Sequence, residues 1–171
     1  SSIYAGGGLG IFGSSNNNIS SVTVLNNNIS SVDDILGGGG FGIYGGSGLP
    51  PPSDNNIINN VTISNNSISS SAEIYGGCFG LIYGSENNII SNITISDNGI
   101  NSSAGIYGGG FGLSASNNNI SGIIISKNTY SAPNEFGIFA LTLNADNNRI
   151  YNSRFNDSSE NIIFLTHYIE N

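Results

Sequence analysis

The chain has 171 residues and a mass of 17.7 kDa, and Asn, Ser, Ile and Gly supply 29, 28, 27 and 25 of its residues. Three basic residues against eleven acidic ones give a net charge of -8, which excludes the phosphate-neutralising surface that nucleic acids require and disfavours binding to anionic membranes. A single Cys and a single His exclude a disulfide framework and the usual zinc sites, and no apolar run is long enough to cross a membrane.

One short string recurs along the chain in a regular phase. It reads IYAGGGLG at 3–10, ILGGGGFG at 35–42, IYGGCFG at 74–80 and IYGGGFG at 106–112, with a degraded copy at 136–141. An Asn-rich block followed by a β-branched triplet keeps the same phase, and an insertion over 47–53 explains the single long interval. We therefore predict one domain of five repeats, at about 2–33, 34–72, 73–104, 105–134 and 135–171.

Each repeat reads as about three short strands. Apolar residues alternate with Thr, Ser or Asn over short stretches, between Asn-Asn and Gly-Gly turn signals. The density of Gly, Asn and Ser would destabilise any helix, whereas Ile, Val, Thr, Tyr and Phe favour a pleated sheet. One repeat cannot bury its own apolar face, but stacked repeats can. The predicted fold is all-β: a right-handed parallel β-helix, or β-solenoid, of about five rungs without helical caps.

Two long runs carry a resemblance to known proteins. The segments NNIINNVTISNNSIS at 55–69 and NNIISNITISDNGIN at 87–101 resemble the right-handed parallel β-helix repeats of the pectin-lyase-like superfamily, and the resemblance covers essentially the whole chain. It implies the fold but not an activity, because that architecture serves polysaccharide lyases, glycoside hydrolases, adhesins, phage tailspikes and surface proteins.

Alignment of the repeats assigns each position to a vertical column. Thr23, Thr62 and Thr94 share a column that strand alternation sends to solvent. The Asn runs mark one corner of every rung, where Asn tolerates left-handed backbone and stacked carboxamides can form hydrogen-bonded ladders. The Gly blocks mark another corner, and no Lys-Ser/Thr follows them as a phosphate loop would require. The expected core column holds Val24, Ile63, Ile95, Ile125 and Phe155.

Eight Asn residues begin an Asn-x-Ser/Thr sequon, close to the number that chance gives for this composition. Asn60 and Asn92 occupy equivalent outward positions just before a strand, so an exported form can carry sugar there. The candidate glycosylation sites are Asn18, Asn28, Asn60, Asn65, Asn92, Asn101, Asn119 and Asn156.

The ionisable residues predict no catalytic constellation, no cofactor and no metal centre. Asp54 and Glu86 are expected to be neighbours in consecutive rungs, aligned with Asn positions elsewhere, where weak cation binding is the alternative to a solvated pair. Lys127 is expected to stand between Asp97 and Asp157 in a surface charge ladder.

Three further positions have competing interpretations. Cys78 lies in a Gly column and is interpreted as a small, partly buried residue, with an intermolecular disulfide or a reactive thiol as the alternative. His167 lies in the C-terminal tail, where packing or solvation is favoured over catalysis. Tyr4, Tyr75 and Tyr107 share a column that either stiffens the wall or stacks on sugar rings.

The two ends of the predicted coil carry no cap, although an open rung exposes unpaired backbone groups over an apolar core. The chain is therefore expected to be a segment of a longer protein, or a subunit whose copies cover one another's ends. The leading hypothesis is a non-enzymatic extracellular structural protein that polymerises head to tail into a filament or surface layer. Candidate subunit contacts are Ile3, Tyr4, Ile162, Ile163, Phe164, Leu165 and Tyr168.

Two alternatives stay open: a carbohydrate-binding or carbohydrate-cleaving β-helix protein, and an adhesin segment of a larger surface protein. The expected partners are copies of the chain itself, with covalent glycans or cell-surface polysaccharide beside them, and no nucleic acid. The chain starts at Ser1 without a charged or apolar leader, so either a signal peptide has been removed or this is a segment, and export is expected.

Overall fold

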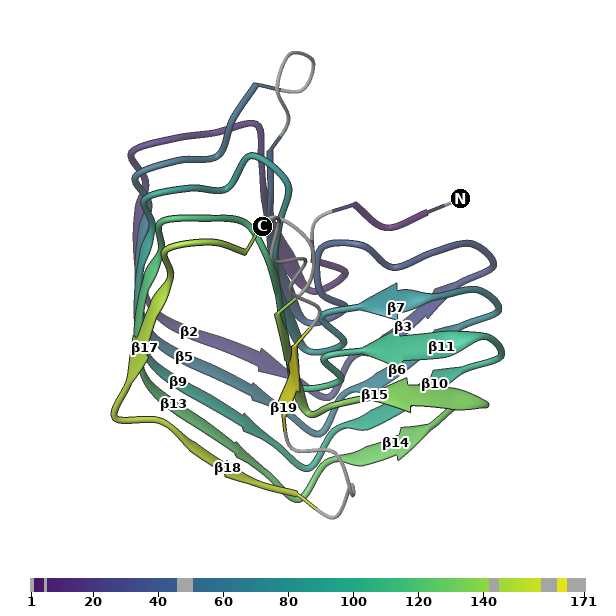
Figure 1. Ribbon diagram of the computed structural model, residues 1–171. Helices are drawn as coiled ribbons and strands as arrows, with labels where there is room; N and C mark the ends of the chain where they lie inside the picture. Colours follow the sequence, from purple (N-terminus) through teal and green to yellow (C-terminus); the bar gives the residue numbers. More distant parts are fainter. Residues whose placement is uncertain (1, 5, 46–50, 142–144, 158–162, 166–171) are drawn as a thin grey trace, which may run out of the picture.

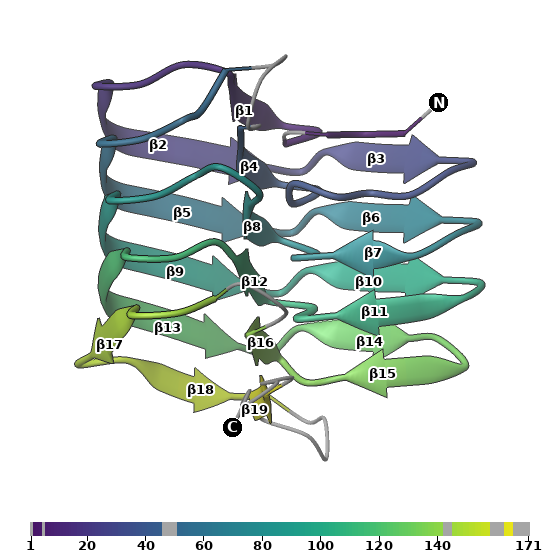
Figure 2. The same ribbon diagram turned by 45° about the horizontal axis from the view of Figure 1, so that its top comes forward.

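The computed structural model describes residues 2–4, 6–45, 51–141, 145–157 and 163–165, and these ranges contain strands and turns but no helix. The chain winds into a parallel β-solenoid, with successive turns stacked along one axis (Figures 1 and 2). Every ladder between strands is parallel, and each joins a strand to its equivalent one turn away. This confirms the all-β solenoid that the repeat pattern predicts.

Four parallel sheets run along the solenoid, and we number them in the order in which one turn meets them. Sheet 1 contains β1 (Leu9–Phe12), β4 (Phe41–Tyr44), β8 (Phe79–Ile82), β12 (Phe111–Ser114), β16 (Phe139–Leu141) and β19 (Ile163–Leu165). Sheet 2 contains β2 (Asn18–Leu25), β5 (Ile57–Ser64), β9 (Ile89–Ser96), β13 (Asn119–Ser126) and β17 (Arg149–Tyr151), with β18 (Arg154–Asn156) also paired to β13. Sheet 3 contains β3 (Asn28–Ser31), β6 (Ser67–Ser70), β10 (Gly99–Ser102) and β14 (Thr129–Ser131). Sheet 4 contains β7 (Ile74–Tyr75), β11 (Gly105–Tyr107) and β15 (Asn134–Phe136).

The structure corrects two counts. A turn has four strands rather than three, because a short turn after Ser102 separates sheet 3 from sheet 4. The solenoid makes about four turns rather than five. The fifth repeat supplies β16, β17 and β18, but the next described strand, β19, pairs with β16 in sheet 1 and adds nothing to sheet 3 or sheet 4.

The corners of each turn use left-handed backbone, which Asn and Gly adopt at low cost. The corner between sheets 1 and 2 has φ between 53° and 62° at Asn16, Asn55, Asn87, Asn117 and Asn147. The long strands of sheet 2 bend at a left-handed residue in their middle, which is Asn60 in β5 and Asn92 in β9. Asn152 adopts the same conformation in the last turn, where it separates β17 from β18. The Asn-rich composition is therefore a backbone requirement of the coil.

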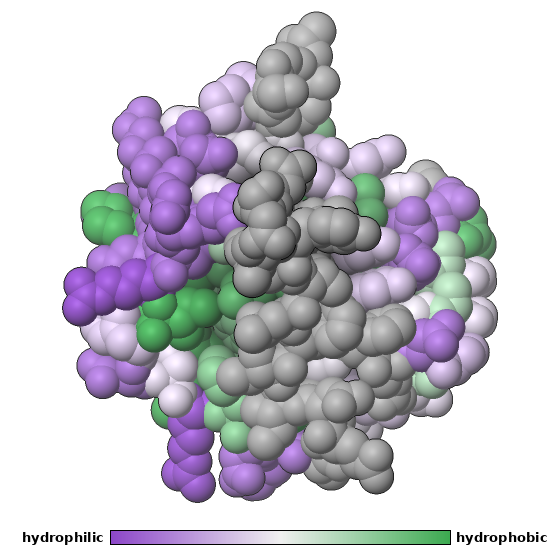
Figure 3. All heavy atoms as spheres, viewed as in Figure 1, coloured by the Kyte–Doolittle hydropathy of each residue, from purple (hydrophilic) through white to green (hydrophobic). Residues whose placement is uncertain are grey.

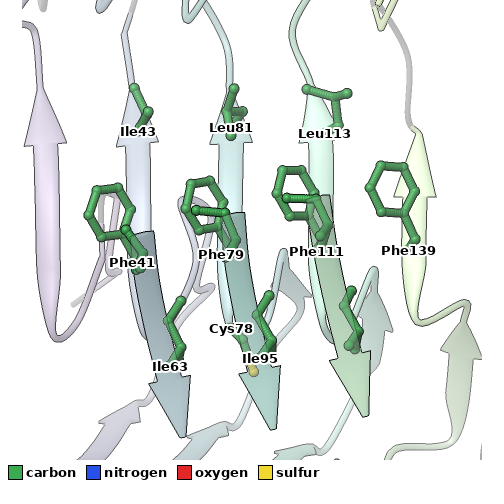
Figure 4. Packing of buried hydrophobic residues seen from close by; sticks show 14 of the residues in the cluster. Phe41, Ile43, Ile63, Cys78, Phe79, Leu81, Ile95, Phe111, Leu113 and Phe139 are labelled. Atoms are coloured by element: carbon green, nitrogen blue, oxygen red, sulfur yellow. The ribbon is translucent and has the colours of Figure 1, made fainter. Parts of the chain in front are cut away.

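Equivalent apolar side chains stack into columns and form one continuous core (Figure 4). The rings of Phe41, Phe79, Phe111 and Phe139 lie nearly parallel, with successive centroids 5.0, 4.8 and 5.1 Å apart. The predicted column is confirmed, since Val24, Ile63, Ile95 and Ile125 are buried and Phe155 packs partly buried against them. The predicted outward Thr column is confirmed as well, because its members are exposed or half-buried. Each fully buried Ile or Phe contributes roughly 1.5–3 kcal/mol.

A column of glycines lets sheet 4 fold back against the outer face of sheet 1. A Cβ on Gly80 would lie 2.7 Å from the backbone nitrogen of Gly38, and a Cβ on Gly112 would lie 2.5 Å from that of Gly76. Gly38 and Gly76 themselves have positive φ. The repeated Gly blocks are thus corners where two backbones touch, as the sequence predicts for a coil and not for a phosphate loop.

Candidate functional site: the open ends of the coil

Two ladders of side-chain amides run the length of the solenoid. Ladder 1 lies at the corner between sheets 1 and 2 and is formed by the second Asn of each pair. The backbone N–H of each member donates to Oδ1 of the member one turn further along, at 2.8 to 2.9 Å. The side-chain Nδ2 donates to the same Oδ1 in three of these four steps, and in the fourth the Nδ2 of Asn118 donates to the carbonyl of Ser116 in its own turn. Its members are Asn17, Asn56, Asn88, Asn118 and Asn148.

Ladder 2 lies at the corner between sheets 2 and 3 and follows the same rule. Both amide groups of Asn27, Asn66 and Asn98 donate to Oδ1 of the next member, with distances of 2.9 or 3.0 Å. The interior members of both ladders are at most 2% exposed. The members of ladder 2 are Asn27, Asn66, Asn98 and Asn128, followed by the carboxylate of Asp157.

Both ladders have a fixed polarity, because each backbone N–H donates to the side chain of the member one turn nearer the C-terminus, although the Nδ2 of several members also donates to a carbonyl of the turn before. At the N-terminal end, Oδ1 of Asn17 and Oδ1 of Asn27 receive no hydrogen bond from any described residue. At the C-terminal end, the Nδ2 of Asn148 donates to the carbonyls of Ala115 and Ala145, and its backbone N–H donates to no described residue. The first turn is also less buried: Ile19 and Val22 are only partly covered, whereas their equivalents in the middle of the coil are buried.

The C-terminal end of the coil has an apolar hollow of about 460 Å³. Figure 3 looks obliquely onto this end and shows hydrophobic atoms in a depression, with hydrophilic atoms above and to the left of them. The lining residues belong to the last strands of sheets 1 and 2, and they include Phe139, Leu141, Ile150, Tyr151 and Phe155. The core is therefore partly open at this end.

The predicted contact residues divide between the two ends. Ile3 is half-buried and bridges to Ile35, while Tyr4 is 48% exposed and meets the ring of Tyr44 edge-on at 5.5 Å. Ile163, Phe164 and Leu165 form β19, which pairs with β16 of its own chain and is the outermost described strand of sheet 1. Ile162 and Tyr168 lie outside the described residues.

The predicted tyrosine column is interrupted by Leu36, which separates Tyr4 from the other two members. Tyr75 and Tyr107 stack with ring centroids 4.7 Å apart and an interplanar angle of 5°. Both hydroxyls donate to the carboxylate of Glu73, which sequence reasoning missed. Burial, with this carboxylate beside it, raises the pKa of both phenols. The pair forms a half-buried aromatic surface with an acidic group at its edge.

The acidic pair sits one position away from where the alignment puts it. Asp54 Oδ1 accepts the backbone N–H of Glu86, and the equivalents in other turns are Ser15, Ser116 and Asp146 rather than Asn. The Asn positions of the alignment are the neighbouring left-handed corner residues. Among the described residues, no group of three or more His, Cys, Asp or Glu side chains could hold a metal ion.

The predicted charge ladder around Lys127 is wrong on one side. Asp157 comes directly after β18, so its carboxylate accepts both amides of Asn128 and the hydroxyl of Tyr130 instead of facing Lys127. Lys127 itself is exposed and occupies a left-handed corner with Asp97 one turn before it. The role of Asp157 was invisible to an alignment with a constant repeat, because the last step of ladder 2 spans 29 residues rather than 30.

Cys78 is fully buried, not partly buried, in the column that holds Gly40 and Gly110. Burial raises the pKa of its thiol, with Asp157 adding a smaller effect in the same direction. Neither an intermolecular disulfide nor a reactive thiol fits this position in the folded chain. His167 lies outside the described residues.

The sequons differ in access. Asn119 is half-buried, and its Oδ1 is a buried atom without a hydrogen-bond partner among the described residues. Asn92 is exposed, but its Nδ2, the atom that would carry sugar, donates to Asn59. Asn60 is exposed on the bend of β5. The other exposed sequon residues are Asn18, Asn28, Asn65, Asn101 and Asn156.

The chain matches no protein-family model, no curated protein and no solved structure. The described residues also contain no helix long and apolar enough to cross a bilayer. What the geometry itself defines is a parallel β-solenoid with polar ladders that run from its first described turn to its last.

Proposed function

We propose that this chain is a non-enzymatic structural protein whose copies stack head to tail through the open ends of the solenoid, forming a filament or surface layer outside the cell. The polarity of ladder 1 carries the proposal. Among the described residues nothing pairs with Oδ1 of Asn17, an acceptor at its N-terminal end, or with the N–H of Asn148, a donor at its C-terminal end. A copy whose Asn17 follows Asn148 along the axis would join these two groups as every internal turn does, and its β1 would take the place that β19 holds beside β16.

The apolar columns support the same arrangement. Ile19 in the first turn and Ile150 in the last belong to one column, which holds Ile58, Ile90 and Ile120 between them. A second copy would cover the partly exposed first turn and the hollow of the last turn together. Such a head-to-tail contact uses two different surfaces of the same chain, so it extends into a filament when the rotation does not close a ring.

Electron microscopy of negatively stained protein, with light scattering at micromolar concentration, tests this proposal. Ladder 1 has five members, so a copy whose Asn17 follows Asn148 begins five strand spacings of about 4.8 Å further along, which predicts an axial repeat of about 24 Å or a small multiple of it. Ile19→Asp would place a charge in the contact and should abolish association. Ile124→Asp is the matched control, because Ile124 is 45% exposed on the outer face of sheet 2. Monodisperse wild-type monomers would overturn the proposal.

We also propose export, N-glycosylation at Asn60, and membership of the pectin-lyase-like superfamily with its right-handed coil. Support for the modification is that Asn60 is exposed on a convex bend and its side chain makes no hydrogen bond to a described residue. Intact-mass measurement of the protein from its native source tests it. A mass that Asn60→Gln leaves unchanged would contradict modification at this residue.

The stacked pair Tyr75 and Tyr107 supports a second candidate function, the binding of polysaccharide along the wall of sheet 4. Flat rings with a carboxylate at their edge can stack on sugar rings and accept hydrogen bonds from sugar hydroxyls. Co-sedimentation with insoluble cellulose and gel retardation in pectin test it, with Tyr107→Ala as the variant. Tyr151→Ala is the control, because Tyr151 is exposed on sheet 2. Equal retention of the wild type and both variants would exclude this surface.

A further inference from the structure

The two ladders end differently at the C-terminal turn. Ladder 1 ends on Asn148, a carboxamide like every other member, whereas ladder 2 ends on Asp157. Oδ1 of Asp157 accepts the backbone N–H of Asn128 at 2.9 Å, and Oδ2 accepts its side-chain Nδ2 at 2.9 Å. The carboxylate therefore accepts from the groups before it and, unlike a carboxamide, has no side-chain N–H to donate to a further turn.

Tyr130 holds this carboxylate in place. The equivalent residues in the three preceding turns are Ile29, Ile68 and Ile100, which all point into the core. Only the last turn has Tyr, and its hydroxyl donates to Oδ2 of Asp157 at 2.6 Å. Two departures from the repeat in consecutive turns, Tyr130 in place of Ile and Asp157 in place of Asn, thus produce a single hydrogen-bonded group near the C-terminal end of the coil.

The consequence appears when a second copy is placed head to tail. On the ladder 1 side, the N–H of Asn148 would meet the free Oδ1 of Asn17. On the ladder 2 side, the carboxylate of Asp157 would meet Oδ1 of Asn27, which is also an acceptor. Two acceptors cannot hydrogen-bond to each other, and a desolvated carboxylate without a donor is costly.

We propose that Asp157 is a stop residue for ladder 2, and that it weakens the contact between stacked copies so that ladder 1 carries the hydrogen bonding of the junction. This inference rests on the proposed head-to-tail stacking and concerns its strength. Asp157→Asn should restore a complete amide at the end of ladder 2. The variant keeps an Oδ1 for Asn128, and the hydroxyl of Tyr130 can accept from the new Nδ2.

The test compares the association constants of wild type, Asp157→Asn and Asn148→Asp by sedimentation velocity over a range of concentrations. One added hydrogen bond in place of an opposed pair of acceptors corresponds to roughly tenfold tighter association for Asp157→Asn. Asn148→Asp keeps the backbone N–H that ladder 1 donates at the junction but places a charge without a donor there, so it should weaken association. Thermal unfolding of each variant verifies that the monomer folds.

The outcomes separate this inference from the proposed function. If the wild type associates and Asp157→Asn does not strengthen that association, the stop role is overturned and the stacking proposal stands. A monomeric wild type with an associating Asp157→Asn variant would support the stop role and overturn stacking as the native function. Monomers throughout, at every concentration reached, would overturn both.

Discussion

Asn88 donates its backbone N–H and its side-chain Nδ2 to one atom, Oδ1 of Asn118, at 2.9 and 3.1 Å. The same Asn88 accepts both amide groups of Asn56 one turn before. Because all three side chains are at most 1% exposed, no water can replace a missing partner. An interior Asn therefore hydrogen-bonds to the turns on both sides of it. Removing one member leaves the polar groups of its neighbours without partners.

Asn88→Ala should lower the free energy of unfolding by about 3 kcal/mol, because it leaves the buried N–H of Asn56 without an acceptor. Asn17→Ala is the matched control, since Oδ1 of Asn17 accepts nothing from the described residues, and it should cost about 1 kcal/mol or less. Urea unfolding followed by circular dichroism measures both. Equal losses for the two variants would show that the ladder contributes no more in the interior than at its end.

Gly112→Ala should destabilise the protein by about 1–3 kcal/mol, because the added methyl group would lie 2.5 Å from the backbone nitrogen of Gly76. Gly99→Ala makes a suitable comparison, since its new methyl group would meet nothing closer than the hydroxyl of Thr129 at 3.7 Å. That variant should be neutral or gain up to about 1 kcal/mol from a less flexible unfolded chain. Thermal unfolding distinguishes the two, and a tolerated Gly112→Ala would contradict the close packing of sheets 1 and 4.

Stability should fall at alkaline pH through Tyr130. Burial raises the pKa of its phenol above the ordinary value of 10.0, with the Cys78 thiol and the hydrogen bond to Asp157 adding to the effect. The folded state then keeps a proton that the unfolded state loses, so the stabilisation is complete below about pH 10 and declines above it, by up to about 1.4 kcal/mol per pH unit for this group.

Urea unfolding at about pH 8 and about pH 11 measures this decline, and Tyr130→Phe should make it shallower. Other tyrosines with raised pKa values, such as Tyr75, keep contributing in that variant. The same slope in wild type and Tyr130→Phe would mean that Tyr130 ionises as freely in the folded protein as in the unfolded chain.

The thiol of Cys78 should not react with a disulfide reagent in the folded protein, because the side chain is fully buried and its pKa is raised. Addition of denaturant should release one reactive thiol per chain, at the concentration where the sheets unfold. Rapid reaction under native conditions would contradict the burial of this column. Cys78→Ser, which places a hydroxyl in an apolar site, should lower the unfolding midpoint.

Because the chain is repetitive, much of its fold can be predicted from the sequence. The period, the all-β character and the inward column through Ile63 and Ile95 follow from local alternation and from the recurrence of the same string. The Asn and Gly corners follow from backbone preference alone, since few residues adopt a left-handed conformation cheaply. These features depend on one turn and its immediate copy, which an alignment of repeats represents directly.

The ladder at the first corner was anticipated for the same reason, but not which Asn of each pair would form it. Asn87 takes the left-handed turn and Asn88 points inward, a choice fixed by how the next turn packs above it. The second ladder was not predicted from the sequence, because the residue that precedes its members varies between Asn, Asp and Lys from turn to turn. The partnership of Glu73 with Tyr75 and Tyr107 also needs two turns side by side.

By itself, the sequence determined a coil of repeated β-strands with amide corners, because each turn obeys the same local rules. Only the tertiary structure decided where that repetition stops. Asp157 breaks the period of ladder 2 by one residue and is held by Tyr130 of the turn before, and β19 returns to sheet 1. Which donors and acceptors stay free at the two ends is set by contacts between turns, and such contacts exist only once the chain has wound upon itself.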